Sequence, residues 1–169
     1  MNVFDVIKKL EKSKEYSSWK KTSEKSYLAH CFRMNDEANK DLWQIGYFNP
    51  KSNLISVFMI DNESITKNPD AEVYKEQEKL VEKLNVDLVK IDENEAMQKS
   101  DEVIKENYKG IAVFKSFMIL QNLEGIGQVW NMTFVTQQFK TVNIKIDANS
   151  GVCVSHKEVS LIKKEKDEE

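Results

Sequence analysis

Two histidines and two cysteines are the side chains in this sequence best suited to metal binding or nucleophilic chemistry. His30 and His156 each fall in a strand-like segment, and neither has a further ligand at a spacing such as H-x-x-x-H. Cys31 and Cys153 lack the close spacing of a metal knuckle or a redox pair, so we expect buried free thiols. The sequence therefore predicts no metal site and no cofactor, and partly exposed strand histidines.

Carboxylates offer no clearer catalytic site. Asp61 and Asp147 could form a carboxylate pair, but each ends a strand and is followed by Asn or Ser within three residues, which is typical of a turn. No phosphate-binding loop or nucleophile elbow is present, and Gly125-Ile126-Gly127 is expected to be a turn between strands. We therefore expect a protein that is not an enzyme.

The elements that would hold these residues are mainly strands. Apolar and polar residues alternate over 129–134 and 142–146, which predicts a β-hairpin that turns at Asp147-Ala148-Asn149-Ser150-Gly151 into a further strand. Other strands are expected at 26–34, 42–49, 54–61 and 111–121.

Helices are expected at three places. Apolar residues at helical spacing predict a helix over 2–14 with Asn2 as its N-cap, followed by a connector that carries Trp19. Asn68-Pro69-Asp70 is typical of a helix start and predicts a helix to about Leu84, whereas 86–91 is a strand or an extended linker. A further helix is expected from Asp92 to about Tyr108, with Gly110 at its C-terminal end.

The two halves of the chain look alike. Trp43 aligns with Trp130 and Asp61 with Asp147, which indicates an internal duplication, although two hairpins that begin with Trp can match by chance. The expected fold class is α+β, with two similar units that each pack an antiparallel sheet against helix. The expected boundaries are 1–67 for the first unit, 68–91 for a linking helix and extended segment, 92–162 for the second unit, and 163–169 for a charged tail.

The second unit carries a family resemblance. Trp130, the strand residues Val142, Ile144 and Ile146, and the run Asp147-Ala148 through Gly151 to Val154 resemble the strand and turn that end PepSY domains, and Glu95-Ala96 resembles the start of their helix. The first half keeps Trp43 and Asp61 but has Asn62-Glu63-Ser64 in place of the Ala-x-Ser-Gly turn. The alternative is a likeness within the broader cystatin-like class, a helix wrapped by an antiparallel sheet. The PepSY resemblance implies a partner protein, with a peptidase held inactive as the candidate.

Charge limits the kinds of partner. Between Asp61 and Tyr108 there are 14 acidic residues and 7 lysines, and Arg33 is the lone arginine of the chain, so no nucleic-acid surface is expected. No apolar run reaches the roughly 20 residues of a membrane-spanning helix, and the N-terminal residues predict an amphipathic helix, so we expect a soluble, cytoplasmic protein of unknown oligomeric state.

These observations favour a non-enzymatic binding or inhibitory module that acts on a protein partner. The alternative is a small-molecule-binding protein with an apolar pocket between helix and sheet. The sheet aromatics are most simply core residues lying under helices, and they could also line such a pocket. Candidate binding residues are these aromatics and two carboxylates of the acidic middle: Trp43, Tyr47, Trp130, Phe134, Glu72 and Glu76.

Overall fold

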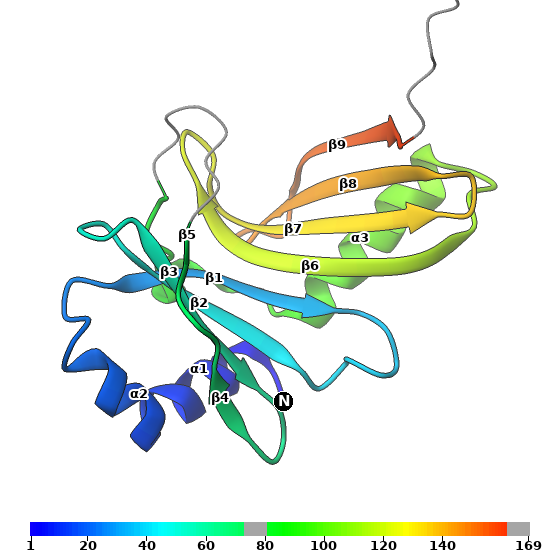
Figure 1. Ribbon diagram of the computed structural model, residues 1–169. Helices are drawn as coiled ribbons and strands as arrows, with labels where there is room; N and C mark the ends of the chain where they lie inside the picture. Colours follow the sequence, from blue (N-terminus) through cyan, green and yellow to red (C-terminus); the bar gives the residue numbers. More distant parts are fainter. Residues whose placement is uncertain (73–80, 162–169) are drawn as a thin grey trace, which may run out of the picture.

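The computed structural model describes residues 1–72 and 81–161, and in these ranges the chain forms one continuous antiparallel sheet with helices on one face (Figure 1). The strands are β1 (Tyr27–Met34), β2 (Trp43–Asn49), β3 (Leu54–Ile60), β4 (Ile65–Lys67), β5 (Ala71–Glu72), β6 (Val113–Leu123), β7 (Gly127–Thr136), β8 (Lys140–Asp147) and β9 (Cys153–Ser160). The helices are α1 (Val3–Glu11), α2 (Lys14–Lys20), the 3-10 turn η1 (Val86–Leu88) and α3 (Glu93–Asn107).

The predicted fold class, two separate helix-plus-sheet units, is wrong. Strand order is β4-β3-β2-β1-β6-β7-β8-β9, with β5 beside β3, so the sheet runs unbroken across the boundary expected between residues 67 and 92. The link is β1 with β6, which pair from His30↔Gln121 to Met34↔Phe117. This pairing satisfies backbone groups that two separate units would leave exposed at a sheet edge.

Local structure does repeat on the two sides of the β1–β6 pair. Trp43 pairs with Ile60 across β2 and β3, and Trp130 pairs with Ile146 across β7 and β8. The Trp43 indole donates to Met1 O at 3.3 Å and the Trp130 indole to Ile91 O at 3.1 Å, in each case the residue before a helix N-cap. These matching contacts lie within one sheet, and their origin in a duplication stays a prediction.

Most predicted strands and two predicted helices are confirmed. Asn2 caps α1 through a bond from Asp5 N of 2.9 Å, and Asp92 caps α3 in a reciprocal capping box with Glu95. In the described part of the chain no helix is long and apolar enough to cross a membrane.

The helix predicted from Asn68-Pro69-Asp70 is wrong at its start and end. Residues 71–72 form β5 beside β3, residues 81–85 are not helical, and 73–80 lie outside the described residues. Asp70 does not open a helix, because its carboxylate accepts from Ser56 Oγ at 2.6 Å and pairs with Lys67 at 2.6 Å. The connector around Trp19 is helical instead: Ser13 caps α2.

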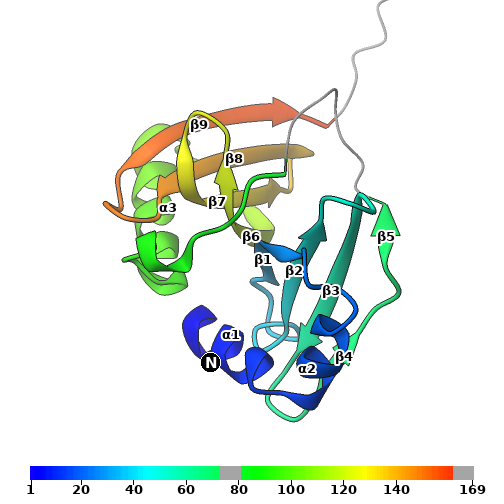
Figure 2. The ribbon, with the colours of Figure 1, turned by 90° about the vertical axis from the view of Figure 1, so that its left-hand side faces the viewer.

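The core lies between the sheet and the helices. Figure 2 shows α1, α2 and α3 on the side toward which the sheet curves. Val3, Val6, Ile7 and Leu10 of α1 and Trp19 of α2 are buried there. The sheet meets them with alternate residues of its strands, such as Cys31, Ile45, Phe58, Leu120 and Ile144, all 0% exposed.

Candidate functional site

Four of the predicted binding residues lie in the core. Trp43 and Trp130 are 0% exposed with ring centroids 6.5 Å apart, and Tyr47 and Phe134 are 2% and 3% exposed. Trp19 of α2 covers Tyr47 at a centroid distance of 5.1 Å. These rings pack in the core between the helices and the sheet, and a protein partner has no access to them in this structure.

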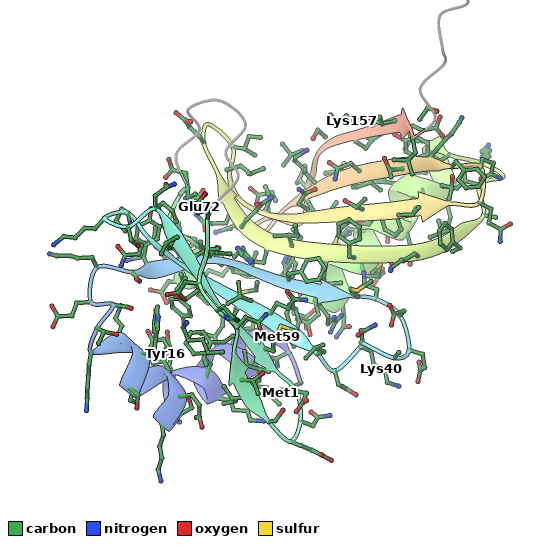
Figure 3. All side chains as sticks on the ribbon, in the orientation of Figure 1. Met1, Tyr16, Lys40, Met59, Glu72 and Lys157 are labelled. Carbon is green, nitrogen blue, oxygen red and sulfur yellow. The ribbon has the colours of Figure 1, made fainter. Side chains whose placement is uncertain are left out.

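The other two predicted binding residues are the carboxylates. Glu72 lies exposed on β5, as Figure 3 shows, whereas Glu76 lies outside the described residues. The helix expected to present both is absent at residue 72, so its acidic outer face is not formed there. A binding role for either carboxylate stays a prediction.

The carboxylates and the histidine that could act in catalysis make structural contacts. The Asp147 carboxylate accepts from Asn149 N at 3.0 Å and Ser150 N at 2.6 Å, bonds that lower its pKa. Asp61 accepts from the same positions of its own turn, so the interpretation of both as turn residues is confirmed. His156 Nδ1 lies 2.7 Å from the hydroxyl of Tyr108, the C-cap of α3. The described residues contain no group of three or more His, Cys, Asp or Glu that could hold a metal.

The two thiols differ in access. Cys31 is 0% exposed, and burial raises the pKa of its thiol. Cys153 is only half-buried, so the prediction of a buried thiol is confirmed for Cys31 and not for Cys153. No disulfide joins them.

A polar cleft of about 450 Å³ lies where α1 and α3 begin. Glu93, 2% exposed, accepts from Val3 N at 3.3 Å and pairs with the Arg33 guanidinium at 3.8 Å. The Arg33 guanidinium also stacks 4.8 Å from the centroid of Trp43, and desolvation lowers its pKa. Glu93 thus ties both helices to the central strand β1, which is a structural role.

The face of the sheet turned away from the helices is apolar at its centre. We call this surface the open face and define it by the side chains of β1, β2, β3 and β6 that alternate with the core residues. Phe32 and Phe117 stack there at a centroid distance of 5.8 Å, and Met59, labelled in Figure 3, pairs with Gln44. Its members are His30, Phe32, Met34, Gln44, Met59, Phe117, Ile119 and Gln121, all half-buried.

A hollow of about 390 Å³ lies in the open face, lined by His30, Phe32, Met34, Gln44, Ile119 and Gln121. Its volume falls near the lower end of the range of about 300–1,000 Å³ for ligand pockets. The lining combines apolar side chains with two carboxamides and no carboxylate or lysine. An apolar group flanked by neutral hydrogen-bonding groups would therefore fit it best.

His30 lies over a glycine. A Cβ built at Gly46 would come within 2.3 Å of His30 Cε1, so the imidazole occupies the space that any other residue at position 46 would need. Desolvation by the surrounding protein lowers the pKa of His30 from 6.5 to about 4. The imidazole is therefore neutral near pH 7, which keeps the hollow uncharged.

The sequence contained a signal for this surface. Residues 57–60 and 117–120 are continuous apolar runs without alternation, which is typical of strands covered on both faces. In the described residues the helices cover one face only. The open face is not predicted from the sequence, because the strand aromatics are expected to lie under helices.

Comparisons with known proteins give the fold and little more. No protein-family model matches the sequence, and no curated protein matches it. A crystal structure of a "putative lipoprotein" from Clostridium difficile 630 is similar, with a TM-score of 0.56 and 12% sequence identity, over 86% of this chain and 90% of that chain. At this identity the likeness shows a shared fold alone.

Proposed function

We propose that the chain is a non-enzymatic binding module that holds an extended segment of a partner protein on its open face. The proposal rests on the apolar centre of the sheet, which none of the described helices covers (Figure 2). There Phe32 contacts Phe117 beside a hollow of about 390 Å³. An apolar surface that stays partly exposed on an otherwise well-packed domain is a candidate interaction site. An apolar side chain of the partner would enter the hollow.

The polar part of the hollow suggests how the segment is held. The carboxamides of Gln44 and Gln121 can each donate to a peptide carbonyl and accept from a peptide N–H. Neutral His30 adds no charge. The favoured partner segment is therefore uncharged at its anchor residue, because a buried unpaired charge would be costly.

The PepSY resemblance supports a peptidase as the partner, and this identity is part of the proposal. A cytoplasmic location and the absence of a nucleic-acid partner stay predictions. The similar "putative lipoprotein" points instead to a location outside the cytoplasm as the competing possibility.

A displayed library of random peptides, selected on the immobilised protein, tests the proposal. We expect enriched peptides to share an apolar anchor, and we expect Ile119→Glu to weaken their binding at least about tenfold, because a carboxylate in the hollow opposes apolar burial. Val154→Glu is the matched control, since Val154 is 44% exposed on β9 at the far edge of the sheet. Equal binding by the wild type and Ile119→Glu would refute the open face as the site.

A second candidate function rests on a separate hollow between helix and sheet. Phe4 and Ile7 of α1, Leu28 of β1, and Val86 and Val89 line a space of about 560 Å³, with Lys8, Glu11, Asp87 and Lys90 also lining it. This hollow suits a small molecule with an apolar body and a charged group. A thermal-shift screen with amphipathic metabolites tests it: a ligand should raise the melting temperature of the wild type and not that of Val86→Trp, whose indole would fill the space.

A further inference from the structure

One end of the sheet gathers exposed apolar side chains. In the described residues Phe139 is 64% exposed, Phe114 62% and Leu161 57%, and Val113 and Val159 join them. Backbone bonds hold the segments together: Leu161 N donates to Phe139 O at 2.9 Å, and Gln137 N donates to Ala112 O at 2.9 Å. We call these five residues the apolar end; it lies at the right of Figure 1, where β6 begins and β7 turns into β8.

Phenylalanine is unfavourable at position 139 for two reasons, its backbone conformation and its exposure. Its φ of 55° lies in the left-handed region, where a bulky residue is strained and Gly or Asn is preferred. Its ring is also the most exposed of the large apolar side chains in the described ranges. Phenylalanine at this turn position is unfavourable for the backbone and exposes a large apolar ring to water. Such a residue indicates that the ring contacts another molecule.

Phe114 is presented by a second irregularity. The β6–β7 register shifts between Val113 and Lys115, so Phe114 occupies a bulge. Bulges are sites where a strand changes the direction of a side chain. Two phenyl rings are thus placed outward at the same end of the sheet by two independent departures from regular structure.

Lysines lie close in sequence to the apolar end. Lys115, Lys140 and Lys157 lie on its strands with Glu158, and the end of α3 and the turn after it carry Lys105 and Lys109 with Glu106, although the whole chain has a net charge of -3. Lys140 pairs with Glu158 at 2.7 Å and Lys105 lies near the Asp101 carboxylate, which leaves Lys109, Lys115 and Lys157 against Glu106. The charge at this end is complementary to an anionic surface.

We propose that the apolar end docks onto the surface of an anionic lipid bilayer, with Phe114, Phe139 and Leu161 entering the boundary between headgroups and acyl chains. The lysines would lie at the level of the lipid phosphates, as basic residues do beside membrane-inserted apolar groups. A protein surface is the weaker choice, because lysine is depleted in protein interfaces and enriched around this patch. This proposal is independent of the partner segment on the open face.

Co-sedimentation with vesicles tests the proposal. The full chain should bind vesicles of phosphatidylcholine mixed with phosphatidylglycerol, bind pure phosphatidylcholine more weakly, and lose binding to the mixed vesicles as salt rises. Phe139→Gly should reduce binding at least about tenfold through lost apolar burial. Its melting temperature should stay equal or rise, because glycine accepts the left-handed backbone.

Two further variants sharpen the result. Phe114→Ser should also weaken binding, whereas Ile126→Ser should not, because Ile126 is 43% exposed in the β6–β7 turn at the opposite end of the sheet. The proposal is overturned if the wild type binds neither kind of vesicle or if Phe139→Gly and Phe114→Ser both bind as the wild type does. Self-association without vesicles that Phe139→Gly abolishes, together with no vesicle binding, would assign the apolar end to a protein interface and overturn the proposal as well.

Discussion

Replacing His30 by phenylalanine should remove a large part of the acid sensitivity of the fold. The phenyl ring can take the place of the imidazole over Gly46, but it does not titrate. In the wild type the pKa of His30 falls from 6.5 in the unfolded chain to about 4 in the folded protein. The unfolded chain therefore binds a proton at that residue before the folded protein does.

The sign and size of the effect follow from this difference. Above pH 6.5 the imidazole is neutral in both states and His30 adds no pH dependence. As the pH falls from 6.5 toward 4, protonation stabilises the unfolded chain alone, and stability is lost until the folded protein also binds the proton. A shift of this size, at about 1.36 kcal/mol per pKa unit, amounts to about 3 kcal/mol between neutral pH and pH 4.

Urea unfolding followed by tryptophan fluorescence, at a series of pH values, measures the effect. Carboxylates titrate over the same range in both proteins, so the quantity of interest is the wild-type free energy of unfolding minus that of His30→Phe. This difference should be constant above pH 7 and fall by about 3 kcal/mol by pH 4. A difference that does not change with pH would refute the desolvated, neutral His30 on which the uncharged hollow depends.

Three further predictions concern the Glu93–Arg33 ion pair, Gly46 and the two thiols. Glu93→Ala should lower the free energy of unfolding by about 3–5 kcal/mol, because Arg33 is left buried without its partner; a loss under about 1 kcal/mol in urea unfolding would contradict this role. Gly46→Ala should destabilise the fold by about 1–3 kcal/mol, because a Cβ there meets the His30 ring, and an unchanged melting temperature would contradict that contact. With a thiol reagent, native protein should be labelled at Cys153 and stay unlabelled at Cys31 until denaturant is added; mass mapping after labelling checks this, and fast modification of Cys31 would contradict its burial.

The local structure could be predicted from the sequence because its causes are local. Alternation of apolar residues gave β7 and β8, and capping residues gave the starts of α1 and α3. The turn role of Asp147 followed from its position at a strand end. Each of these depends on residues fewer than about five positions apart.

The continuous sheet could not be predicted, because the pairing of β1 with β6 joins segments that are far apart in the sequence. Nothing in β1 or β6 alone indicates that Cys31 will pair with Leu120. Asn68-Pro69-Asp70 has the residues of a helix start, but the tertiary contact of Asp70 with Ser56 overrides that preference.

The surroundings of the predicted binding aromatics also depend on packing that is not local. Trp43 and Trp130 are predicted binding residues because a helix across a curved sheet can leave an apolar pocket, and in the structure both rings are buried in the core. Alternation along a strand separates the two faces but does not say which one is covered. The open face became visible only when the helices were placed.

Mapping a bound peptide by nuclear magnetic resonance tests whether the open face is the binding site. A peptide selected on the wild type is titrated into protein labelled at methyl groups. We expect shifts of Met34 and Ile119 in the open face, with little change at Val142 and Ile144, which are core residues of β8 and 0% exposed. Shifts confined to the helix-covered side or to the β9 edge, with Met34 and Ile119 unmoved, would contradict it.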